Sequence, residues 1–151
     1  MIRALVMSFV CASLAARADP VLPLRVEAVA TVEHGNSMIQ FSVSNVSASP
    51  ITMYTADLPW GGFKSVLIVG STRQHETLPA VPPLIDDPGP QKTTIEPGQT
   101  LRGEKKLSRH IRGVDTERRK QDVIVLWLYE ARDQNAQSKG SYVGWIALSR
   151  E

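Results

Sequence analysis

Several short segments of this chain have apolar residues at every second position, and turn-forming residues separate these segments. Residues 25–33 alternate in this way, and residues 38–43 alternate again after His34-Gly35-Asn36. Because glycine and asparagine tolerate the positive φ of a tight reversal, the pattern predicts a hairpin. No long segment has the period of an amphipathic helix, which favours an all-β fold. Further strands are predicted at residues 51–55, 63–69, 100–107 and 141–148.

The strongest predicted strand is the segment from Asp122 to Glu130. Val123, Val125, Trp127 and Tyr129 alternate with Ile124, Leu126 and Leu128, so both faces of the strand are apolar. A strand of this kind is expected at the centre of a sheet with both faces buried, because an exposed face would promote aggregation. The segment after Ser141 is expected to be its antiparallel neighbour.

Two connections differ in composition from the strands. Residues 70–93 hold Pro79, Pro82, Pro83, Pro88 and Pro90, which is half of the ten prolines, and proline lacks the N–H that a central strand needs. Long connections of this kind are commonly functional or disordered. The charged connection from Ser108 to Gln121 is expected to contain one or two helical turns, because Leu107, Ile111 and Val114 have helical spacing.

The predicted fold class is all-β, an antiparallel β-sandwich of about seven strands with no disulfide. The run Phe41-x-Val43-x-Asn45-x-Ser47-x-x-Pro50-Ile51 and the run Ile95-x-Pro97-Gly98-x-Thr100-Leu101 carry a resemblance. Together they resemble the hairpin and turn segments of bacterial immunoglobulin-like domains, a fold also found in small secreted binding and proteinase-inhibitor modules. In Glu96-Pro97-Gly98-Gln99, Pro and Gly stand at the second and third positions, as a type II turn requires.

Residues 1–18 resemble a secretory signal peptide, with Arg3 near the start, an apolar run, and Ala16-Arg17-Ala18 as a small-x-small cleavage site. Residues 19–151 are then expected to form a single β-sandwich domain, exported to the periplasm or secreted. Removing the signal takes away Arg3, Arg17 and the only cysteine, Cys11. The remaining basic and acidic residues balance, which argues against nucleic-acid binding. The longest later apolar run, Val123–Tyr129, is too short for a membrane span.

Few residues in the sequence suggest catalysis or metal binding. His34, His75 and His110 lie far apart in the sequence and none has a partner at ligand spacing, so no metal site is predicted. Met38 and Met53 fit core packing better than copper binding. Asp86 and Asp87 are expected to form a turn, and no Gly-x-Ser-x-Gly motif is present. The sequence therefore predicts a protein that is not an enzyme and needs no cofactor.

A basic stretch and a pair of aromatic residues are the candidate binding elements. Residues 102–120 hold eight basic and three acidic residues, and such a surface attracts acidic partners. Trp60 and Phe63 stand in a turn, where aromatic side chains serve as interface anchors or cap the end of a sandwich. The predicted partner-binding residues are Trp60, Phe63, Arg109, Arg112, Arg118 and Arg119.

These observations together predict an exported, non-enzymatic binding module, monomeric or weakly associating, that recognises another envelope or secreted macromolecule through its loops. The partner is expected to be another protein or an anionic envelope component. Three alternatives remain open at this point. The chain is an inhibitor or immunity protein for a secreted hydrolase, an accessory subunit of an envelope assembly, or a periplasmic metal-handling protein.

Overall fold

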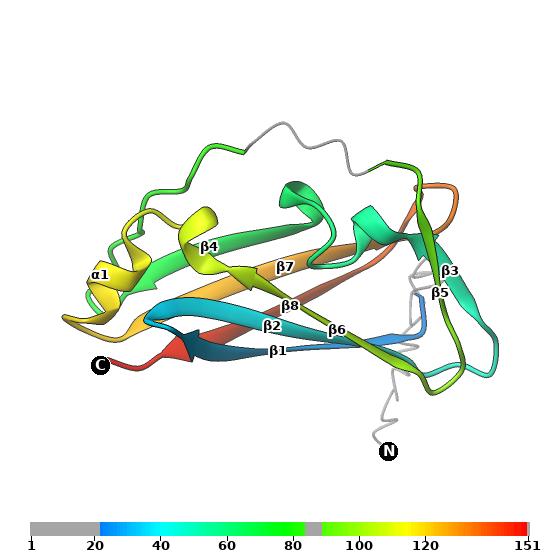
Figure 1. The fold of residues 1–151 in the computed structure, drawn as a ribbon, viewed down its shortest axis with the longest axis horizontal. Coiled ribbons are helices and arrows are strands. Elements are labelled where there is room, and N and C mark those ends of the chain that lie inside the picture. Colours follow the sequence, from blue (N-terminus) through cyan, green and yellow to red (C-terminus); the bar gives the residue numbers. More distant parts are fainter. Residues whose placement is uncertain (1–21, 84–88, 151) are drawn as a thin grey trace, which may run out of the picture.

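The computed structural model describes residues 22–83 and 89–150. The predicted signal segment 1–18, Cys11 and the Asp86-Asp87 pair lie outside the described residues. The fold is mostly β, with eight strands, one short α-helix and three 3₁₀ turns (Figure 1). The strands are β1 Leu24–Glu33, β2 Asn36–Asn45, β3 Ile51–Tyr54, β4 Val66–Thr72, β5 Lys92–Ile95, β6 Thr100–Lys106, β7 Val123–Arg132 and β8 Ser138–Leu148. The helical elements are η1 Thr55–Asp57, η2 Phe63–Ser65, η3 Leu107–Arg109 and α1 Val114–Arg118.

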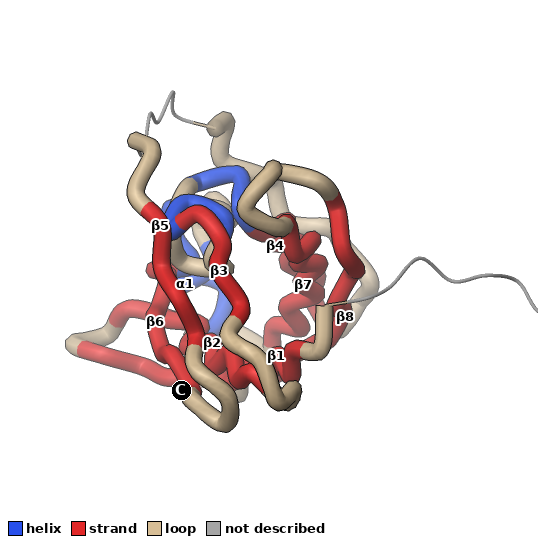
Figure 2. Tube along the Cα trace, turned by 90° about the vertical axis from the view of Figure 1, so that its right-hand side faces the viewer, coloured by secondary structure: helices blue, strands red, loops and turns tan. Residues whose placement is uncertain are grey.

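The strands form three small antiparallel sheets. One sheet has the order β1-β2-β6, a second has the order β4-β7-β8, and β3 pairs with β5 alone. The two three-stranded sheets lie on opposite sides of the molecule, as the end view in Figure 2 shows. The predicted hairpin of β1 and β2 is confirmed, with His34 and Gly35 in the left-handed region at its turn.

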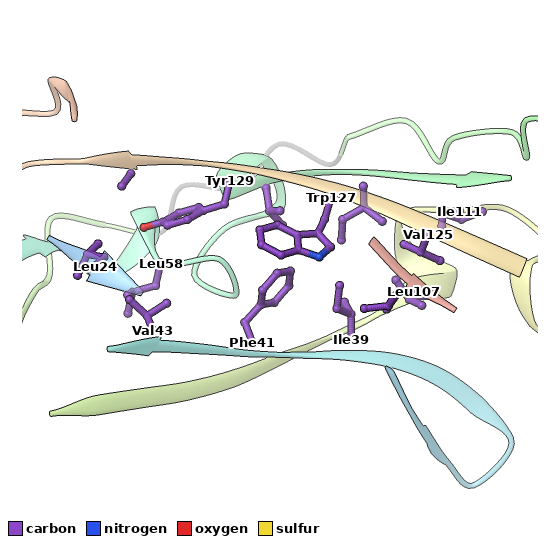
Figure 3. Close-up of a cluster of buried hydrophobic side chains, with 14 of the residues drawn as sticks. Leu24, Ile39, Phe41, Val43, Leu58, Leu107, Ile111, Val125, Trp127 and Tyr129 are labelled. Carbon is purple, nitrogen blue, oxygen red and sulfur yellow. The ribbon is translucent and has the colours of Figure 1, made fainter. Parts of the chain in front are cut away.

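The apolar side chains of β2 and β7 meet between the two three-stranded sheets (Figure 3). The rings of Phe41 and Trp127 are 5.5 Å apart and nearly perpendicular, an edge-to-face contact that aromatic quadrupoles favour. Ile39, Val43 and Val125 are fully buried around this pair. Burial of these faces is the main contribution to the stability of the fold.

The two segments that carry the resemblance, residues 41–51 and 95–101, lie side by side. The amide N–H of Asn45 donates to the carbonyl of Gln99 at 3.0 Å, and the N–H of Gly98 donates to the carbonyl of Asn45 at 2.9 Å. Gly98 has φ of 73°, and the N–H of Gln99 donates to the carbonyl of Glu96 at 2.9 Å, which confirms the turn predicted at Pro97-Gly98.

Two strand predictions are corrected. Residues 63–65 form a 3₁₀ turn, and β4 begins at Val66 and continues through Gly70 to Thr72. Gly70 lies in this strand next to Ile111, whose Cδ1 would be 2.9 Å from a Cβ at this position. The proline-rich segment also ends earlier than predicted, since Lys92–Ile95 pairs with β3 and adds the eighth strand.

The position of β7 was predicted correctly, but the burial of both of its faces was not. It lies between β4 and β8 at the centre of its sheet. Val123, Val125 and Tyr129 are fully buried, whereas Ile124, Leu126 and Leu128 on the other face are 39, 50 and 38% exposed. An antiparallel sheet commonly has one face on the core and the other in solvent, and here the solvent face is apolar.

Candidate functional site

The charged connection between β6 and β7, residues 108–121, is held to the body of the protein by buried apolar residues. Leu107, Ile111 and Val114 are each 1% exposed or less. The N–H groups of His110 and Ile111 both donate to the carbonyl of Leu107, and Gly113 begins α1 from the left-handed region, with φ of 74°. The predicted helical turns are therefore confirmed, and they fix one face of the connection against the core.

The first part of the proline-rich segment also holds this connection in place. The N–H of Val81 donates to the carbonyl of His110 at 2.9 Å, and the N–H of Arg112 donates to the carbonyl of Pro79 at 2.8 Å. Ala80 and Ile111 form an isolated antiparallel bridge between these two bonds. Because proline lacks an N–H, Pro79 takes part only through its carbonyl, and Val81 supplies the donor of this segment. Residues 79–81 and 110–112 thus form one ordered surface.

Phe63 packs against His110, one of the residues of this surface. Its ring stacks on the imidazole of His110 at 4.5 Å, and His110 is only 7% exposed. Burial, followed by the positive charges of Lys105 and Arg109, lowers the pKa of His110 to about 4. The imidazole is therefore neutral at physiological pH, and it serves as a packing surface for Phe63.

Trp60 is half-buried and lies over β6. A Cβ on Gly103 would come within 2.2 Å of the Trp60 ring, so the ring rests directly on the backbone of this strand. The ammonium group of Lys105 donates to the carbonyl of Gly62. Both contacts fasten the turn that holds Trp60 and Phe63. Trp60 thus supports this turn on β6, and Phe63 supports His110 of the connection, and neither side chain is fully exposed.

The arginines predicted to bind a partner differ in exposure. Arg109, Arg112 and Arg119 are exposed on the connection. Arg118 departs from the prediction, because it is 4% exposed and follows Ile111 and Val114 along the buried face of the short helix. Lys105 also turns inward, at 9% exposed. The basic surface is therefore smaller than the sequence suggested and centres on the three exposed arginines.

The acidic residues of the connection have their own partners. A carboxylate oxygen of Asp115 accepts the backbone N–H of Ser37 at 2.7 Å, which attaches α1 to the start of β2. Glu117 pairs with Lys120 at 3.2 Å and accepts a hydrogen bond from Gln121 at 2.6 Å. These contacts with Gln121 and Lys120 lower the pKa of Glu117. Both carboxylates thus stabilise the connection itself.

The three histidines lie in different surroundings. His34 and His75 are exposed in turns with positive φ, whereas His110 is buried. Within residues 22–83 and 89–150, no group of three His, Cys, Asp or Glu side chains is placed to hold a metal ion. Met53 is fully buried in the core. In the same ranges, no helix has the length and apolar character needed to cross a membrane.

A second surface, which the sequence interpretation missed, is the outer face of the sheet β4-β7-β8. It consists of exposed apolar residues in register across the three strands. Its most exposed members are Val143 at 73%, Trp145 at 67% and Leu67 at 59%. The sequence did indicate this surface, because β7 is apolar on both faces and an apolar face is usually covered by another element. We call this surface the outer apolar face, formed by Leu67, Val69, Ile124, Leu126, Leu128, Val143 and Trp145.

No family model matches this chain, and a search of curated proteins finds no significant relative.

Proposed function

We propose that this protein is an exported binding module with an immunoglobulin-like β-sandwich fold, which acts without catalysis on another secreted or envelope macromolecule. The face-to-face packing of the two three-stranded sheets supports the sandwich. The contact between Asn45 and the Pro97-Gly98 turn supports the resemblance to immunoglobulin-like domains. Fold alone does not assign a function, so the proposal depends on the surface of the charged connection.

The observation that carries the proposal is the packing and hydrogen bonding that hold the connection on which Arg109, Arg112 and Arg119 are exposed. The connection that presents them is fixed by the buried residue Ile111, by the Phe63–His110 stack, and by backbone hydrogen bonds to residues 79–81. A binding surface ordered before the encounter loses less conformational entropy when the partner arrives. Guanidinium groups also bind carboxylates in a bidentate geometry. The favoured partner is therefore a protein with an acidic surface.

The experiment is affinity capture from envelope and culture-fluid extracts, with the purified protein as bait at low and moderate salt. The double variant R109E/R112E is compared with the wild-type protein. The matched control is R25E/R73E, which makes the same change in net charge at two arginines exposed on β1 and in the turn after β4. We expect the wild-type protein and the control to retain a partner that R109E/R112E loses. Equal capture by both variants would contradict the proposal, as would no capture by any bait.

One observation favours inhibition of a secreted hydrolase as the more specific form of this function. Pro79, Ala80, Pro82 and Pro83 are exposed on a segment that two backbone hydrogen bonds hold in place. An ordered, exposed segment of this kind can enter an enzyme cleft at low entropic cost. Inhibition is tested with a panel of envelope and secreted hydrolases. Inhibition is supported if one hydrolase loses its activity with excess wild-type protein but keeps it with the Ala80→Arg variant. It is contradicted if every hydrolase in the panel keeps its full activity.

A further inference from the structure

The outer apolar face forms three uncharged rows across the sheet β4-β7-β8. Register pairs Val69 with Leu126 and Leu126 with Trp145 in the middle row. One flanking row is Leu67-Leu128-Val143, and the other is Ser71-Ile124-Ala147. Within β7, the nearest charged residues on the same side, Glu130 and Arg132, pair with each other at 3.4 Å. Directly before β7, a carboxylate oxygen of Asp122 accepts the backbone N–H of Arg150 at 2.8 Å. The three rows therefore contain no charged side chain, and a partner would recognise this face by its shape and its apolar area.

The exposed apolar area is large for a protein of this size. Six of its side chains are between 38 and 73% exposed, which amounts to an area on the order of 600 Å². This value reaches the upper end of the largest apolar patches on ordinary monomers, about 300–600 Å². Buried on two copies, this area would total about 1,200 Å², the lower end of the range that specific protein interfaces bury.

We propose that the outer apolar face binds the same face of a second copy of this protein. A twofold axis running along the middle row would bring Leu126 against Leu126 and Trp145 against Trp145 of the second copy. It would also bring the bulky flanking row against the row that contains Ser71 and Ala147. Large side chains would then meet small ones, and two such sheets pack about 10 Å apart. An uncharged face suits an identical copy because no like charges are brought together.

This inference is independent of the charged connection and its partner. It is tested by sedimentation of the purified protein over a range of micromolar concentrations. Val143→Glu places a carboxylate on the outer apolar face. The matched control is Val29→Glu, because Val29 is also a valine on an edge strand and is 54% exposed, but it belongs to the other sheet. Circular dichroism and thermal melting check that both variants fold.

We expect a concentration-dependent mass of two chains for the wild-type protein and for Val29→Glu. The dissociation constant of Val143→Glu should rise at least about tenfold. A mixture of Leu126→Glu and Leu126→Lys chains should associate more tightly than either variant alone, because the twofold axis brings residue 126 against itself. The proposal is overturned if the wild-type protein has the mass of a single chain at every concentration. It is also overturned if Val29→Glu weakens the dimer as much as Val143→Glu does, or if the mixture of Leu126 variants associates no more tightly than either variant alone. Binding of single chains to phosphatidylcholine vesicles would assign the face to lipid and also overturn it.

Discussion

The contact between Trp60 and β6 makes a sharp prediction about Gly103. In Gly103→Ala, the new Cβ would come 2.2 Å from Cγ and Cδ2 of Trp60, so the ring must leave its position or β6 must shift. Expelling about half of a tryptophan side chain from its packing costs about 2–3 kcal/mol, similar to the cost of overpacking. We expect the free energy of unfolding to fall by this amount and the Tm to fall by about 10 °C.

The assay is urea and thermal unfolding of the wild-type protein and the variant. Gly62→Ala is the control, because its Cβ would meet only the Ala56 carbonyl, at 3.4 Å, and we expect little change. In Trp60→Leu/Gly103→Ala, the cost of the alanine should be smaller than in the wild-type background. If Gly103→Ala is as stable as the wild-type protein, Trp60 does not pack on β6 as described, and its supporting role is refuted.

Two further predictions concern stability. The pKa of His110 is lowered to about 4, so unfolding takes up a proton between that pH and 6.5. The contribution of the neutral His110 to the free energy of unfolding is fully present above pH 6.5. It is lost as the pH falls towards 4, and the total loss is about 3 kcal/mol. Chemical denaturation should show that the free energy of unfolding depends less steeply on pH in His110→Gln than in the wild-type protein. An equal dependence on pH would disprove the lowered pKa of His110. The amide group of Asn45 donates to the carbonyls of Ile95 and Ser49, each at 2.8 Å, and accepts from Ser47. Asn45→Ala should therefore cost about 2–3 kcal/mol in urea unfolding, whereas a cost near zero would show that these bonds are replaced by water.

The parts of the fold that depend on local chemistry were predictable from the sequence. The β1–β2 hairpin follows from its period of two and from the reversal expected at Gly35-Asn36, although the residues with positive φ are His34 and Gly35, one position earlier. The Pro97-Gly98 turn follows from the residues that a type II turn requires. The central position of β7 follows from its long apolar run. In each case the pattern within a few residues determines the conformation.

The features that could not be predicted depend on contacts between distant segments. Alternation shows that both faces of β7 are apolar, but it does not show whether another element covers each face. The stack of Phe63 on His110 joins residues that are far apart in the sequence. The burial of Arg118 was predictable in principle, because this residue continues the helical spacing of Ile111 and Val114.

The most direct test of the proposed function is the rate at which a captured partner associates with the protein, measured at increasing salt concentration. If the exposed arginines of the connection recognise an acidic surface, the wild-type association rate will fall steeply with salt, because salt screens the attraction. The R109E/R112E variant will associate slowly and show a weak or reversed dependence on salt, and R25E/R73E will stay closer to the wild-type protein. Association rates that are the same for R109E/R112E and the wild-type protein at every salt concentration would contradict the account.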